Sequence, residues 1–158
     1  MINARIETIA IKPAFREVFK KNRCLIIADG FFEWKGEKGR KQPYFITIAS
    51  GGPFAFAGLW DTWYKKGDKE SVYSSCTIIT TTASKSLSEL HDRMPVIFLP
   101  EYQELWLNPG IKSPKDLEAI LRDGITSDMQ YYQVSKLVNS AENNDPACVV
   151  PIDTQSFE

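Results

Sequence analysis

The chain has 158 residues, of which 43% are hydrophobic, and its net charge is −1. Residues 1–41 contain ten Lys/Arg and five Asp/Glu, whereas residues 42–158 contain nine Lys/Arg and fifteen Asp/Glu. This composition excludes a disordered chain and predicts one soluble domain over residues 1–158. The apolar runs are too short for a membrane span, and the N-terminus has no signal-peptide pattern, so we expect a cytoplasmic protein. The basic first quarter is either a solvated face or the footprint of a phosphate-binding surface.

The first half of the chain is predicted to form one short helix and a series of strands. Residues 13–21 place Phe15, Val18 and Phe19 on one helical face, with Pro13 in the first turn. Asp29-Gly30 is typical of a turn or bulge. The strands predicted after the helix are Cys24–Ala28, Phe31–Trp34, Tyr44–Ile48, Phe54–Trp60 and Ser71–Thr81.

The second half of the chain mixes helices with further strands. A single helical turn is expected at Leu87–Leu90, and a clear helix runs from Ser113 as N-cap to Gly124 past its end. The remaining predicted elements are a strand at Val96–Leu99, a helix after Pro100, and late strands at Tyr131–Val134 and Val149–Ile152. With no repeat and no linker, the pattern predicts a single α+β domain whose sheet is built mostly from local hairpins.

His91 is the only histidine and begins the string His91-Asp92-Arg93-Met94-Pro95. An imidazole titrates near pH ~6.5, so this side chain can exchange a proton close to neutrality. A lone histidine can equally cap a strand or satisfy a buried carbonyl. Its neighbours, a carboxylate and a guanidinium, make it a candidate for chemistry.

Glu33 lies among the aromatic residues Phe31, Phe32 and Trp34. If these side chains desolvate its carboxyl group, the pKa of Glu33 rises and the residue becomes a usable general acid. Strand alternation allows a different interpretation, in which Phe32 and Trp34 face the core and Glu33 faces solvent. Both interpretations remain open on this stretch alone.

Several strings in the chain together resemble the SOS response-associated peptidase (SRAP) family, which includes bacterial and human proteins that cross-link to abasic sites in single-stranded DNA. The resemblance covers residues 1 to about 152, in the order of the family. Its strings are NARIET (3–8), KPAFR (12–16), RCLIIADGFFEW (23–34), FAGLW (56–60), CTIITT (76–81), HDRMPV (91–96) and VSKLVNS (134–140).

The resemblance implies a fold and roles for particular residues. The fold is α+β, with a curved, barrel-like, mostly antiparallel sheet and a few short helices. Glu33 and His91 match the acid/base groups of the family, and Asn3 matches the asparagine that orients the reacting group. The same resemblance implies a peptidase-type or lyase-like activity by which the family also processes its own N-terminus.

Single-stranded DNA with abasic sites is the implied partner, with neither a membrane nor a metal or cofactor. Arg5 matches the arginine that holds phosphate, Arg93 is a further phosphate contact, and Arg16 adds to the basic first quarter. A guanidinium suits this role because it pairs with phosphate through two hydrogen bonds and keeps its charge.

In one respect the sequence departs from the family. The family attacks the abasic aldehyde with the amine and thiol of an N-terminal cysteine, giving a thiazolidine, whereas residue 2 is Ile2. We therefore expect that the N-terminal part carrying the nucleophile is absent, and that Cys24, Cys76 and Cys148, taken as inert, reduced thiols, do not replace it. The alternatives are a non-covalent single-stranded-DNA binder and, more remotely, a small-molecule hydrolase pairing Glu33 with Asp29 or Asp61.

Overall fold

The computed structural model describes residues 1–65 and 68–152, so residues 66–67 and 153–158 of the expected domain lie outside the described residues. The described residues form two compact units. Unit 1 comprises Met1–Ala28, Phe54–Thr82 and Arg93–Thr126, and unit 2 comprises Asp29–Pro53, Ala83–Asp92 and the chain from Ser127 onward. The α+β class with mostly antiparallel pairing and few short helices is confirmed. The described strands form one five-stranded and one three-stranded sheet, and no closed barrel.

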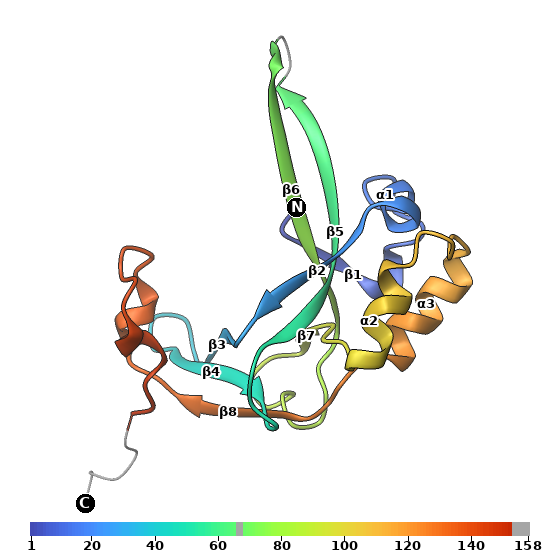
Figure 1. Ribbon diagram of the computed structural model, residues 1–158. Coiled ribbons are helices and arrows are strands. Elements are labelled where there is room, and N and C mark those ends of the chain that lie inside the picture. The colour runs from blue at the N-terminus through green and yellow to red at the C-terminus, as the bar shows by residue number, and fades with distance from the viewer. Residues whose placement is uncertain (66–67, 153–158) are drawn as a thin grey trace, which may run out of the picture. The chain divides into compact units, whose positions relative to one another are not determined.

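Unit 1 is built on the five-stranded sheet (Figure 1). Its order is β1 (Asn3–Arg5), β6 (Asp68–Thr82), β5 (Phe54–Lys65) and β2 (Arg23–Ala28), with β7 (Arg93–Pro95) also paired to β6. Among the described strands of this sheet, only the β1–β6 pair is parallel. Past the Leu59–Thr77 pair, β5 and β6 continue as a two-stranded ribbon, which Figure 1 shows extending away from β1 and β2.

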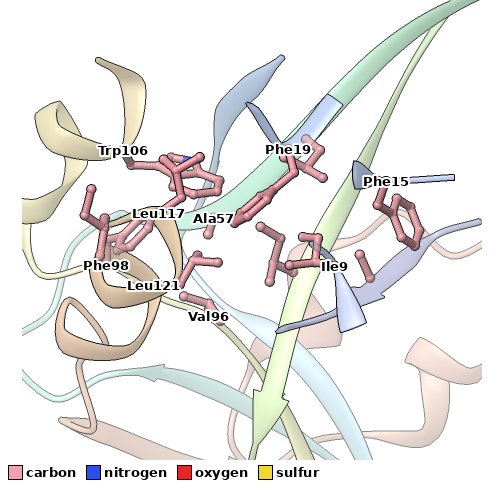
Figure 2. Close-up of a cluster of buried hydrophobic side chains, with 13 residues drawn as sticks. Ile9, Phe15, Phe19, Ala57, Val96, Phe98, Trp106, Leu117 and Leu121 are labelled. Carbon is pink, nitrogen blue, oxygen red and sulfur yellow. The ribbon is translucent and has the colours of Figure 1, made fainter. Parts of the chain in front are cut away.

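The core of unit 1 lies between its sheet and its helices, α1 (Arg16–Lys21), α2 (Pro100–Leu107) and α3 (Pro114–Asp123) (Figure 2). Trp106 is fully buried there and packs against Phe19 and Phe98, with ring centroids 6.0 and 5.6 Å apart. The ends of α3 are as predicted, because the Ser113 side chain accepts a hydrogen bond from the Asp116 N–H and Gly124 is the C-cap. No helix in the described part of the chain is long and apolar enough to cross a membrane.

Unit 2 contains the antiparallel sheet of β3 (Phe31–Lys35), β4 (Gln42–Ile48) and β8 (Met129–Gln133). Aromatic rings line one face of it, with Phe45 packed against both Phe32 and Tyr132. Gly30 precedes β3, and a Cβ there would lie 2.1 Å from the ring of Phe45, so only glycine fits. Short 3₁₀ helices occur at Lys136–Asn139 (η2) and Pro146–Val149 (η3), and unit 1 has one at Ile6–Thr8 (η1).

Three predicted elements were wrong in type or position. The first helix begins at Arg16 rather than Pro13, because the preceding residues form turns in which Lys12 O accepts from the Phe15 and Arg16 N–H groups. The strand expected at Val96–Leu99 lies at Arg93–Pro95, followed by isolated bridges at Ile97 and Phe98. In the late strand expected at Val149–Ile152, Val149 is instead the last residue of η3, where Asp145 caps the Ala147 N–H at 2.7 Å. Pro151 makes only an isolated antiparallel bridge to Val134.

The cysteines differ in their exposure. Cys148 is buried and Cys24 is half-buried, but Cys76, which lies in the strand predicted at Ser71–Thr81, is exposed. Cys76 lies on β6 beyond Ile78, in the part of the strand that forms the ribbon with β5. Burial raises the pKa of the Cys24 thiol, and the charge of Cys76 raises it further.

Candidate functional site

Glu33 lies in the middle of β3, opposite Tyr44 of β4, and its side chain is half-buried rather than directed fully into solvent. Burial raises the pKa of the Glu33 carboxyl above its ordinary value. His91, when protonated, opposes this rise, as do a backbone hydrogen bond at Trp34 and the charge of Lys41, while the charge of Asp92 adds to it. Glu33 therefore holds its proton to higher pH than a solvated glutamate.

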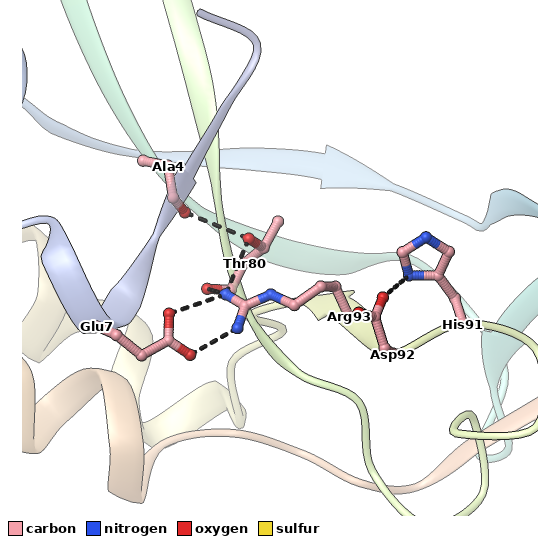
Figure 3. Close-up of polar contacts among 6 residues, drawn as sticks. All are labelled: Ala4, Glu7, Thr80, His91, Asp92 and Arg93. Atoms are coloured by element: carbon pink, nitrogen blue, oxygen red, sulfur yellow. Dashed lines mark hydrogen bonds and ion pairs between the residues drawn. The ribbon is translucent and has the colours of Figure 1, made fainter.

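His91 ends a series of turns in which its N–H donates to Leu87 O at 3.1 Å. Its imidazole Nδ1 lies 3.0 Å from Asp92 Oδ1, and 46% of the His91 side chain is exposed (Figure 3). The Asp92 carboxylate can thus orient the imidazole ring. Because the charge of His91 acts on Glu33, the two predicted acid/base residues are neighbours within unit 2.

Asn3 and Arg5 belong to unit 1 and project from the same face of β1. Ala4 between them is buried, and Asn3 and Arg5 are both exposed. The short strand is held in register because Asn3 pairs with Ile78 and Arg5 with Thr80 on β6. An amide and a guanidinium on one exposed face can together contact the oxygens of a bound ligand.

Arg93, on β7 of unit 1, is held by an ion pair that the sequence did not predict. Its Nη1 lies 2.6 Å from Glu7 Oε1 and its Nη2 lies 3.1 Å from Glu7 Oε2 (Figure 3). Nη2 also donates to Thr80 O at 2.7 Å. The hydrogen bond from Arg93 is the main cause of the lowered pKa of Glu7, which burial opposes. A phosphate at Arg93 would have to compete with this carboxylate.

The remaining candidates from the sequence are Arg16, Asp61 and Asp29. Arg16 is exposed at the first residue of α1. Asp61 lies on β5 in unit 1, where its carboxylate accepts from the Thr62 N–H at 2.8 Å, and Asp29 is exposed in unit 2. Asp92 is the carboxylate whose charge raises the pKa of Glu33, so it takes the place expected for Asp29 or Asp61.

Two residues of the site escaped the sequence reasoning, Asp92 as the partner of His91 and Glu7 as the partner of Arg93. Asp92 lies in the family string HDRMPV and Glu7 in the family string NARIET, and this position within the strings is the one sequence feature that could have identified them. Among the described residues, no three His, Cys, Asp or Glu side chains come together in the way that a metal site requires.

Comparison with known proteins gives consistent matches. The family model described as SOS response associated peptidase (SRAP) matches residues 1–141. The chain is 44% identical over 150 residues to the abasic site processing protein YoqW of Bacillus subtilis, covering 94% of this chain and 66% of YoqW. It is 33% identical over 154 residues to the abasic site processing protein YedK of Escherichia coli, covering 96% of this chain and 68% of YedK.

A solved structure of a protein from Bacteroides thetaiotaomicron is similar to the chain, with a TM-score of 0.84 and 33% identity. The match covers 95% of this chain and 65% of that protein. The chain thus spans about two thirds of the length of these three proteins.

Proposed function

The chain belongs to the SOS response associated peptidase (SRAP) family, and on that premise we propose that it recognises abasic sites in single-stranded DNA and takes part in their covalent capture. Its relatives YoqW and YedK are named abasic site processing proteins, which supports the choice of substrate. A cytoplasmic location and the peptidase or lyase-like self-processing of the family belong to the same proposal.

Glu33 and His91 are proposed as the acid/base pair. An abasic deoxyribose in its open form is an aldehyde, and an amine that attacks it gives a carbinolamine. Protonation of the carbinolamine hydroxyl by Glu33 would release water and leave an iminium ion, whose N–H proton returns to the Glu33 carboxylate to give the imine. A thiol then adds to the imine carbon while its proton passes through His91 to the nitrogen. The balance is one thiazolidine and one water formed from aldehyde and aminothiol, with no change of oxidation state.

The observation that carries this assignment is the raised pKa of the half-buried Glu33. A general acid works best when its pKa lies near the operating pH, and a solvated glutamate would be almost fully ionised there. The neighbouring His91, oriented by Asp92 at 3.0 Å, supplies the complementary base. Two titratable groups with different environments are a common acid/base arrangement.

Recognition of the strand is assigned to the polar groups of unit 1. Arg5 is proposed to hold a phosphate and Asn3 to orient the reacting group, which their shared exposed face supports. Arg16 would add a more distant phosphate contact. Arg93 would take part only if a phosphate displaces Glu7, so its first role is to hold the local structure.

A non-covalent role is the second candidate, and a specific observation favours it for the 158-residue polypeptide. Residue 2 is isoleucine, which offers no thiol. Cys148 is buried, and burial raises the pKa of Cys24, which lowers its thiolate fraction. Cys76 is exposed, but it lies inside β6, where its nitrogen is a peptide amide and cannot form the thiazolidine ring. The polypeptide would then bind abasic single-stranded DNA without closing a thiazolidine.

Equilibrium binding to an abasic single-stranded oligonucleotide, at low and moderate salt, tests recognition. We expect affinity to fall steeply with salt, and Arg5→Ala to weaken binding and reduce the salt slope by ~0.7 for one lost phosphate contact. Arg122→Ala on α3, whose guanidinium pairs with Asp123 at 3.2 Å, is the matched control and should behave as wild type. Salt-independent binding, or equal losses in both variants, would contradict the proposal.

A further inference from the structure

A polar pocket of about 320 Å³ lies in unit 2, at the connecting end of the β3–β4 hairpin. Trp34 comes from the end of β3 and Lys41 from the residue before β4, while Lys136 and Asn139 come from η2. The lining residues are Trp34, Gly39, Lys41, Lys136 and Asn139. We call this the Lys41–Lys136 pocket.

The ionisable side chains that line this pocket are both cationic. In the described part of the chain, neither Lys41 nor Lys136 forms an ion pair with a carboxylate, whereas the nearby Lys35 pairs with Glu89 at 3.7 Å. The charge of Lys41 reaches Glu33 and lowers its pKa, but Glu33 does not line the pocket. Two cations facing one hollow create a field that favours an anion.

The polar wall of the pocket is held in a defined orientation. Trp34 Nε1–H, which can only donate, lies 2.7 Å from Asn139 Oδ1. That bond fixes which end of the amide is the acceptor and leaves the Asn139 NH₂ group as a donor. The Gln42 amide also bonds Val134 O at 2.8 Å, which ties the hairpin to the segment that leads into η2.

We propose that the Lys41–Lys136 pocket binds a phosphate group. Its polar side chains offer two ammonium groups and an amide NH₂, and all of these donate hydrogen bonds, as the acceptor oxygens of phosphate require. The pocket is distinct from the Glu33 site, because strand alternation puts Glu33 and Trp34 on opposite faces of β3. The rings of Phe32 and Trp34, two residues apart, contact each other, as expected for side chains on the same face.

The phosphate can come from the backbone of a DNA strand or from a free phosphate or nucleotide. The DNA source rests on the proposed function, in which the pocket would hold a backbone phosphate away from the acid/base pair. The free source does not depend on that function. One experiment with two arms separates them.

In the first arm, inorganic phosphate is titrated into the 158-residue protein while NMR follows the indole N–H resonance of Trp34. We expect a saturable shift, at least tenfold weaker in Lys136→Gln and in Lys41→Gln. Lys38→Gln, which removes an exposed lysine of the same hairpin connection that does not line the pocket, is the control and should retain wild-type binding. No saturable shift, or equal weakening in the control, would overturn the proposal.

In the second arm, binding to an abasic single-stranded oligonucleotide is measured against salt. If the slope of log affinity against log salt concentration falls by ~0.7 in Lys136→Gln but not in Lys38→Gln, the phosphate belongs to DNA. An unchanged slope together with saturable phosphate binding supports the pocket with a free phosphate or nucleotide as its source. If the protein binds no DNA but binds phosphate, the proposed function fails while the pocket stands.

Discussion

Arg93 and Glu7 form a two-pronged ion pair across 86 residues of sequence, with N–O distances of 2.6 and 3.1 Å. The pair joins β7 to η1, and the bond from Arg93 to Thr80 O adds β6 to the same network. Only 19% of the Arg93 side chain is exposed. An arginine in the position expected for a phosphate contact therefore also holds unit 1 together.

Glu7→Gln should lower the stability of the protein, and by less at low pH. The folded-state pKa of Glu7 lies below its ordinary value, so its ionised form contributes stability above the unfolded-state pKa, and this is lost as pH falls through the folded-state pKa. With 46% of the Glu7 side chain exposed, we expect a loss of under about 1 kcal/mol at pH 7. Urea unfolding at several pH values checks this; a difference that does not narrow in acid would contradict it.

Arg23→Lys should destabilise unit 1 more strongly. The buried Arg23 donates to Trp106 O and Asn108 O at 2.6 Å, to Lys20 O at 2.8 Å and to Phe19 O at 3.3 Å, so it satisfies carbonyls at the ends of α1 and α2. A lysine cannot reach all four carbonyls with one ammonium group. Unsatisfied buried acceptors predict a loss of about 2–4 kcal/mol in urea unfolding. The exposed Arg122→Lys should change little, and an equal effect would argue against the assignment.

Glu33→Gln should raise the stability of the folded protein near neutral pH. The folded-state pKa of Glu33 is raised, so the native state binds this proton more tightly than the unfolded chain, and stability falls as pH rises through the folded-state pKa. Removing the charge therefore stabilises above that pH and has little effect below it. Thermal unfolding across pH measures the difference, with the exposed Glu37→Gln as control. If Glu33→Gln is less stable than wild type at neutral pH, burial of the ionised Glu33 carboxylate does not destabilise the folded protein, and the prediction is wrong.

Elements with local signals could be predicted from the sequence. Helix α3 was predicted to within a residue, because Ser113, Pro114 and Gly124 specify its ends through contacts with their own neighbours. The pairing of β3 with β4 likewise follows from one short connection between two aromatic strands. Glu33 and His91 were identified as candidates from residue chemistry and the family strings.

Contacts between distant residues could not be predicted. The Arg23 side chain bonds the Trp106 carbonyl 83 residues away, and nothing near Arg23 in the sequence indicates it. The exposure of Cys76 depends on how far β5 and β6 run past the rest of the sheet. Asp145 and Pro146 start η3, which includes Val149, and the expected strand at Val149–Ile152 is reduced to one isolated bridge between Pro151 and Val134.

The rate of adduct formation with abasic single-stranded DNA tests the central claim about Glu33 and His91 most directly. It is measured by denaturing gel shift and intact mass, in a version of the protein in which an N-terminal family segment with the cysteine nucleophile precedes Asn3. We predict that Glu33→Gln and His91→Ala each slow the adduct by on the order of 10²–10⁴-fold, whereas Glu37→Gln does not. Adduct formation at the full rate in Glu33→Gln, or a stable adduct with the 158-residue chain alone, would contradict the account.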